Sequence, residues 1–134
     1  MGLVFTSILT IHYQHIPIRI YTPHAPAAHD KLPILVFYHG GGFVIGSLDS
    51  YDSLCRALAN RAECIVISVD YRLAPEQKFP AALNDALGAY QWAADHADEL
   101  DGDAKRLAIA GDSAGGNITA VTAIKIRDKD EVAP

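Results

Sequence analysis

Three apolar runs, each followed by a segment with helical periodicity, constrain the fold of this chain more than any other feature. The runs cover residues 34–38, 64–69 and 107–110. A continuous apolar run is typical of a parallel strand that helices bury on both faces. The predicted helices cover residues 50–61, 80–97 and 114–127. This alternation predicts an α/β fold, in which a mostly parallel sheet has helices on both faces.

Two further β-patterns precede these runs, at residues 7–12 and 16–21. Ile16, Ile18 and Ile20 alternate with other residues, which is the pattern of a strand with one apolar face. The turn residues between the two patterns predict an antiparallel pair that is added to the parallel sheet. Pro17 cannot donate a hydrogen bond to a ladder, so we expect its strand to lie at an edge.

Composition limits the classes of protein to which the chain can belong. It has 134 residues, half of them apolar, which suits one globular domain and not a disordered chain. Sixteen acidic and eleven basic residues give a net charge of −5, which argues against a nucleic-acid partner. No apolar run approaches the ~20 residues that cross a bilayer, so we expect a cytoplasmic protein without a membrane span.

Cysteine and histidine usage argues against a disulfide framework or a metal centre. Cys55 and Cys64 are expected to be two buried small apolar residues that do not form a disulfide. No cluster of histidine, cysteine and carboxylate residues has the spacing of metal ligands. We therefore expect no metal and no cofactor.

Seven of the ten glycines lie in two short stretches, four in residues 40–46 and three in residues 111–116. Each stretch directly follows a predicted buried strand, where open α/β sheets have their ligand sites. The second stretch contains the pattern G-x-S-x-G between a strand and a helix, which is typical of a serine nucleophile on a strained turn. Gly111 and Gly115 leave room where the strand and the helix pass each other, and Ser113 is the candidate nucleophile.

The first stretch begins with His39, Gly40, Gly41 and Gly42. Three adjacent glycines leave N–H groups bare, and a donor that points at a developing oxyanion lowers the barrier by roughly 3–4 kcal/mol. The N–H of Ala114 starts the predicted helix, where it has no internal partner and the helix dipole favours negative charge. We expect His39 to organise the loop through hydrogen bonds to its backbone and not to act as a general base.

These two motifs and the segment Tyr-Arg-Leu-Ala-Pro-Glu at residues 71–76 resemble those of one known family. The sequence is similar, over residues 16–127, to the hormone-sensitive-lipase-like branch of the α/β-hydrolases, which are carboxylesterases and lipases. The resemblance implies an α/β-hydrolase sheet and hydrolysis of small-molecule esters through a serine acyl-enzyme. We interpret the segment 71–76 as scaffolding around the site.

The resemblance also implies a role for individual residues. Ser113 corresponds to the nucleophile, and the oxyanion hole corresponds to the N–H groups of Gly41, Gly42 and Ala114. Asp112 matches a family motif, and we interpret it as a supporting residue that transfers no proton.

The histidine of a catalytic triad is missing from its usual place in the sequence. In this fold the chain order is serine, then an acid, then histidine. All six histidines precede Ser113, at positions 12, 15, 24, 29, 39 and 96. Asp128 and Asp130 follow it, in a polar run that is typical of a solvated helix end.

We therefore expect residues 1–134 to be a partial α/β-hydrolase domain, truncated after the nucleophile helix, from a fragment or a truncated gene product. The cap helices and the C-terminal half with the acid and the histidine are expected to be absent. Loss of a triad member lowers the rate by about 10⁴–10⁶, so we expect these residues alone to be inactive. The strand at 107–110 is then an open edge, along which we expect self-association.

Other functions remain open on the sequence alone. Gly40, Gly42 and Gly46 follow a strand and Asp70 ends the next one, as in a dinucleotide-binding module. However, the residues after Gly46 read as a loop, whereas a pyrophosphate needs a helix N-terminus there. A second alternative is a non-catalytic ligand-binding relative on the same scaffold, and a third is a non-functional remnant.

Overall fold

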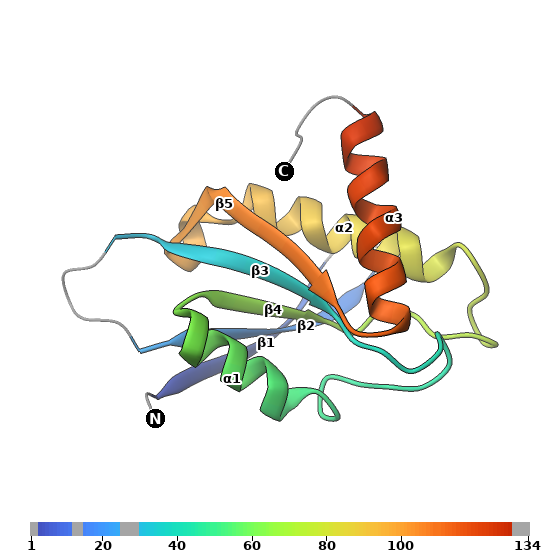
Figure 1. Ribbon diagram of the computed structural model, residues 1–134, viewed down its shortest axis with the longest axis horizontal. Helices are drawn as coiled ribbons and strands as arrows, with labels where there is room; N and C mark the ends of the chain where they lie inside the picture. The colour runs from blue at the N-terminus through green and yellow to red at the C-terminus, as the bar shows by residue number, and fades with distance from the viewer. Residues whose placement is uncertain (1–2, 12–14, 25–29, 130–134) are drawn as a thin grey trace.

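The computed structural model describes residues 3–11, 15–24 and 30–129 as five strands, three α-helices and one short 3₁₀-helix (Figure 1). The strands are β1 (Val4–Ile11), β2 (Ile16–Pro23), β3 (Leu32–Tyr38), β4 (Ile65–Val69) and β5 (Gly102–Gly111). The helices are α1 (Asp52–Ala62), α2 (Ala81–Asp95), α3 (Ala114–Asp128) and the 3₁₀-helix η1 (Asp98–Leu100). Each predicted buried strand and each predicted helix is present, with bounds that differ by a few residues.

The strands form one sheet in the order β1-β2-β4-β3-β5. β3 pairs in parallel with both β4 and β5, whereas β1 and β2 form an antiparallel pair that continues antiparallel onto β4. The predicted mixed α/β sheet is thereby confirmed. Because β3 and β5 are parallel neighbours, their carboxyl ends lie side by side, with Tyr38 opposite Gly111.

The prediction that Pro17 marks an edge strand is wrong. β2 lies between β1 and β4 and pairs with both strands. Pro17 pairs with Thr10 in the register with β1, but the register with β4 begins only at Ile18, so on the β4 side no ladder N–H is required at Pro17. Its carbonyl oxygen accepts a hydrogen bond from the N–H of Asp70, with an N–O distance of 3.0 Å.

The helices divide between the two faces of the sheet, and each face has its own apolar cluster (Figure 1). α1 covers one face, where Cys55 and Ala59 pack with Tyr21, Phe37 and Val66. α2 and α3 pack on the other face and contact each other, over a cluster that includes the isoleucines of β2 and β4. Alternate residues of β4 are thus buried on opposite faces, which explains why four of its five residues are apolar.

Cys55 and Cys64 are both buried and both free, as the sequence predicts. Burial raises the pKa of the Cys55 thiol to about 11 and also raises the pKa of the Cys64 thiol. Both side chains therefore behave as small apolar groups beneath α1.

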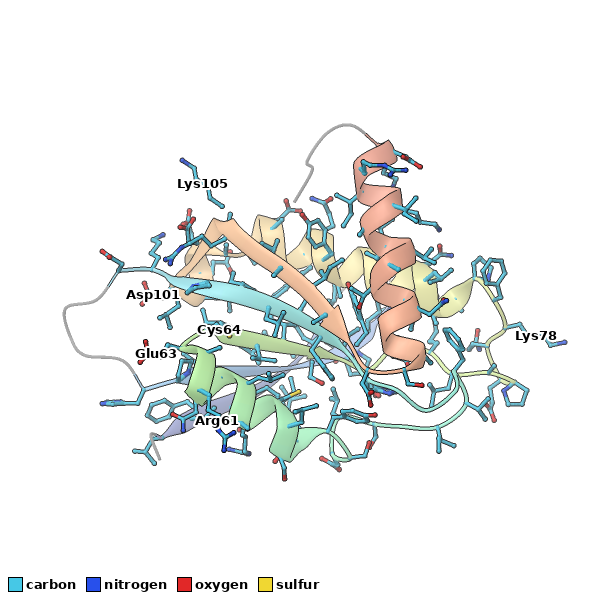
Figure 2. The ribbon with its side chains drawn as sticks, in the orientation of Figure 1. Arg61, Glu63, Cys64, Lys78, Asp101 and Lys105 are labelled. Carbon is cyan, nitrogen blue, oxygen red and sulfur yellow. The ribbon has the colours of Figure 1, made fainter. Side chains whose placement is uncertain are left out.

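β5 begins earlier than the apolar pattern indicates. It starts at Gly102, which pairs with Leu32, although the apolar run starts only at Leu107. The first part of the strand is largely exposed, and Lys105 projects away from the sheet (Figure 2). Within the described residues β5 lies at one edge of the sheet, as predicted. β1 likewise starts early, at Val4, and the end predicted for it at residue 12 falls outside the described residues.

Candidate active site

The two glycine-rich stretches meet at one end of the sheet because they follow neighbouring parallel strands. β3 ends at Tyr38 and β5 ends at Gly111, and these two residues are partners in the register. Directly beyond the strands, the N–H of Asp112 donates to the carbonyl oxygen of Tyr38 with an N–O distance of 3.3 Å. Both loops leave the sheet at the same end (Figure 1). The predicted site residues of the two stretches are therefore neighbours in space.

Ser113 stands on a sharp turn between β5 and α3. Its backbone has φ 54° and ψ −115°, and a positive φ at a non-glycine residue persists only where the surrounding structure enforces it. A Cβ on Gly115 would lie 1.9 Å from the carbonyl oxygen of Tyr38. A Cβ on Gly111 would lie 2.2 Å from the carbonyl oxygen of Gly115. The missing side chains let the strand and the helix pass this closely, and they leave Ser113 exposed at the turn.

Three backbone N–H groups at these loops have no protein acceptor among the described residues. Gly41 and Gly42 have φ values of 128° and 64°, in a turn where the carbonyl oxygen of Gly41 accepts from Ile45 at an N–O distance of 3.0 Å. Ala114 is the first residue of α3, so its N–H has no intrahelical acceptor. Within the described part of the chain, the N–H groups of Gly41, Gly42 and Ala114 donate to no protein acceptor. Donors of this kind stabilise the oxyanion of acyl transfer.

His39 holds the glycine loop from inside the molecule. Its side chain is fully buried and its ring stacks on that of Tyr71, with the ring centroids 4.3 Å apart. Nδ1 donates to the carbonyl oxygen of Gly40 at 2.7 Å, since a carbonyl oxygen can only accept. The hydroxyl of Tyr71 donates to the carbonyl oxygen of His39 at 2.6 Å, and burial raises the pKa of this hydroxyl to about 12. Nε2 of His39 has no partner among the described residues, and no hydrogen bond there links it to Ser113.

An ion pair that the sequence analysis missed anchors the segment 71–76. Asp85 on α2 is fully buried and accepts from the guanidinium of Arg72, with an Nη2–Oδ1 distance of 2.8 Å. The backbone N–H of Arg72 also donates to Oδ2 of Asp85, at 2.9 Å. The N–H of Ala74 donates to the carbonyl oxygen of Phe43 at 2.8 Å, which joins this segment to the glycine loop. The available signal was a carboxylate among the apolar residues in the first half of a predicted amphipathic helix.

Asp112 has a second partner that the sequence analysis also missed. The hydroxyl of Tyr51, the residue before α1, donates to Oδ2 of Asp112 at 2.7 Å. This hydrogen bond raises the pKa of the Tyr51 hydroxyl and burial adds to the rise, whereas a backbone hydrogen bond from Gly40 lowers it. No local pattern connects Tyr51 with Asp112, because 61 positions separate them.

The other histidines and carboxylates that the sequence analysis considered have separate surroundings. His96 is half-buried at the end of α2, where its ring stacks on that of Trp92 with centroids 4.5 Å apart. Asp128 is the last residue of α3 and pairs with Arg127 at 3.0 Å. Asp130, His12 and His29 fall outside the described residues.

The described ranges show no group of three or more histidine, cysteine or acidic side chains that could hold a metal ion. In the same ranges, every helix is too short or too polar to span a membrane.

The loop at Gly40, Gly42 and Gly46 is not followed directly by a helix, because α1 begins only at Asp52. The helix N-terminus that a dinucleotide pyrophosphate requires is therefore not adjacent to Gly46.

Comparisons with known proteins agree with this fold. Residues 35–134 match the family model for the alpha/beta hydrolase fold. Carboxylesterase NlhH of Mycobacterium tuberculosis is 53% identical over 113 residues, which is 84% of this chain and 35% of that protein. Ethyl acetate hydrolase of Pseudomonas putida is 42% identical over 127 residues, 95% of this chain and 40% of that protein. The solved structure of a hyperthermophilic esterase from the archaeon Pyrobaculum calidifontis has a TM-score of 0.91 at 48% identity, over 98% of this chain and 43% of that chain.

The chain therefore belongs to the α/β-hydrolase fold family. Its relatives, which are named carboxylesterase, ethyl acetate hydrolase and esterase, place it in the hormone-sensitive-lipase-like branch, as its motifs imply. It spans between 35% and 43% of the length of the three relatives described above.

Proposed function

We propose that this chain carries the nucleophile and the oxyanion hole of a serine carboxylic ester hydrolase that acts on small-molecule esters. The observation that carries the proposal is the strained turn at Ser113, which lies beside the free N–H of Ala114. The glycine loop with its two further free N–H groups is joined to this turn through the hydrogen bond from Asp112 to Tyr38. The ester-hydrolase names of the relatives support the choice of substrate class.

In the proposed reaction, Oγ of Ser113 attacks the carbonyl carbon of the ester while its proton passes to a histidine base. The charge that develops on the carbonyl oxygen is stabilised by the N–H groups of Gly41, Gly42 and Ala114. The bond from the carbon to the alcohol oxygen then breaks, and the alcohol leaves with the proton from the histidine. Water hydrolyses the acyl-serine by the same steps and regenerates the hydroxyl.

The histidine and the acid of this reaction are proposed to come from outside residues 1–134, which then form the nucleophile part of a larger domain. In the ranges that the structure describes, no hydrogen bond joins Ser113 to a histidine, because His39 faces the inside of its loop and His96 stacks on Trp92. Without a base the Ser113 hydroxyl keeps its ordinary reactivity. The 134 residues alone then hydrolyse esters about 10⁴–10⁶ times more slowly than the complete enzyme.

A chimaera tests this proposal. Residues 1–134 are joined to the part of the Mycobacterium tuberculosis carboxylesterase that follows the matched segment, and hydrolysis of 4-nitrophenyl acetate is measured. We expect turnover by the chimaera and a loss of at least about 10⁴-fold in its Ser113→Ala variant. Residues 1–134 by themselves are expected to stay at the background rate. A folded chimaera without Ser113-dependent turnover contradicts the proposal.

A further inference from the structure

We propose that Tyr51 is a positioning residue, whose hydroxyl holds the glycine loop and the nucleophile turn in register and so keeps the two halves of the oxyanion hole together. This inference rests on the proposed function, since it concerns the same site. It adds a residue from a third element, the start of α1, which neither the glycine motif nor the serine motif contains.

The two halves of the proposed oxyanion hole come from different loops. Gly41 and Gly42 follow β3, whereas Ala114 follows β5. The backbone bond that joins the loops beyond the strands, from Asp112 to Tyr38, has an N–O distance of 3.3 Å. This distance is longer than in a well-formed backbone hydrogen bond. A preorganised site needs a further link, because displaced donors lose most of their effect on the transition state.

The hydroxyl of Tyr51 supplies such a link. It donates to Oδ2 of Asp112, the residue before Ser113, at 2.7 Å, which is the length of a well-formed O–H···O hydrogen bond. A Cβ on Gly40 would lie 2.9 Å from the hydroxyl oxygen of Tyr51 and 2.8 Å from the carbonyl oxygen of Asp112. The backbone at the start of the glycine loop therefore packs directly against the hydrogen bond that holds the turn.

Tyr51 is itself held in place by parts of the molecule outside the two loops. It directly precedes α1, and its carbonyl oxygen accepts from the N–H of Cys55 at 3.0 Å. Its ring lies 5.8 Å, between centroids, from the ring of Phe37 on β3 and also from the ring of His39. The phenol thus has a defined position, and its hydroxyl transmits that position to Asp112.

Two matched variants separate positioning from a general effect on stability. Tyr51→Phe removes the bond to Asp112, and Tyr21→Phe removes a bond of the same type to Asp52, which has an O–O distance of 2.8 Å. Tyr21 bonds to Asp52 at the start of α1, whereas Tyr51, the residue before α1, bonds to Asp112 in the nucleophile turn. A general loosening of α1 is therefore expected to affect both variants alike.

The first readout is the set of backbone amide resonances in the 134-residue protein. We expect Tyr51→Phe to shift the N–H resonances of Gly41, Gly42 and Ala114, and we expect Tyr21→Phe to leave them in place. Unchanged resonances in Tyr51→Phe overturn the inference, whether or not Ser113 is reactive. If Tyr51→Phe does not fold, Asp112→Asn replaces it, because it keeps an oxygen acceptor without the charge and is expected to cause smaller shifts of the same resonances.

The second readout is the rate at which Ser113 reacts with a 4-nitrophenyl phosphonate, with imidazole as an external base. The Oγ–P bond forms, nitrophenolate leaves, imidazole takes the proton of the hydroxyl, and the phosphoryl oxygen occupies the place of the oxyanion. We expect the rate to fall about tenfold or more in Tyr51→Phe and less than about twofold in Tyr21→Phe. Equal rates in the two variants overturn the positioning role. If the wild-type protein is not labelled at Ser113, the proposed function fails instead. The amide resonances alone then test the positioning role of Tyr51.

Discussion

Two adjacent glycines at the start of α3 give a matched test of the close approach that creates the serine turn. A Cβ on Gly115 would lie 1.9 Å from the carbonyl oxygen of Tyr38 and 2.8 Å from that of His39. Both contacts are with main-chain atoms, so no side-chain rotation relieves them. A Cβ on Gly116 would meet only the carbonyl oxygen of Gly111, at 3.5 Å, which is an ordinary contact. The Gly115→Ala variant is therefore expected to be clearly less stable than the Gly116→Ala variant.

The size of the expected difference in stability follows from these contacts. Ordinary contact begins at 3.4 Å, so the backbone at Gly115→Ala must move by 3.4 − 1.9 = 1.5 Å. Overpacking of this kind destabilises by about 1–3 kcal/mol. Alanine is more favourable than glycine inside a helix by about 1 kcal/mol, which makes Gly116→Ala neutral or stabilising. For a domain of this size we expect the melting temperature of Gly115→Ala to lie about 5–15 °C below that of Gly116→Ala.

Thermal unfolding followed by circular dichroism at the helix band measures this difference. Both variants keep the same helix length and charge, so the wild-type protein and each variant serve as controls for one another. Equal melting temperatures for Gly115→Ala and Gly116→Ala refute the reasoning, because the strand and the helix then do not pass as closely as the strained turn requires.

Three further outcomes are expected. Arg72→Met lowers the free energy of unfolding by about 1–3 kcal/mol, because it leaves the buried Asp85 carboxylate with only the backbone donor; an unchanged urea midpoint contradicts this. Asp52→Asn destabilises the protein at pH 7 but progressively less as the pH falls. The hydrogen bond from Arg56 lowers the pKa of Asp52 below its usual 3.8, so its stabilisation is present above that value and is lost as the pH falls through the lower folded-state pKa. If Asp52→Asn lowers the free energy of unfolding by the same amount at every pH from 7 to 2, this prediction is contradicted. The open edge of β5 leads us to expect dimers or larger species in sedimentation experiments, and a monodisperse monomer argues against that expectation.

The sequence was sufficient for the features that depend on neighbouring residues. The apolar runs of β3 and β4 predict buried parallel strands, because both faces of each strand carry apolar side chains. The strand–glycine–serine–glycine–helix order predicts the turn at Ser113, because small residues on either side are what such a turn requires.

The remaining features depend on contacts that no local pattern encodes. The bond from Tyr51 to Asp112 and the ion pair of Arg72 with Asp85 form only once the sheet brings distant segments together. The start of β5 was missed because its first residues are largely exposed and lack an apolar pattern. The prediction for Pro17 was wrong because a proline outside the register with only one of its two neighbouring strands gives the same sequence pattern as a proline on an edge strand.

The central claim is that the Ser113 hydroxyl faces the backbone N–H groups of two loops. A crystal structure of the protein with a phosphonate bound covalently to Oγ of Ser113 tests it most directly. We expect the phosphoryl oxygen to lie about 3 Å from the backbone nitrogens of Gly41, Gly42 and Ala114. A phosphoryl oxygen that points into solvent, or that contacts none of these nitrogens, contradicts the account.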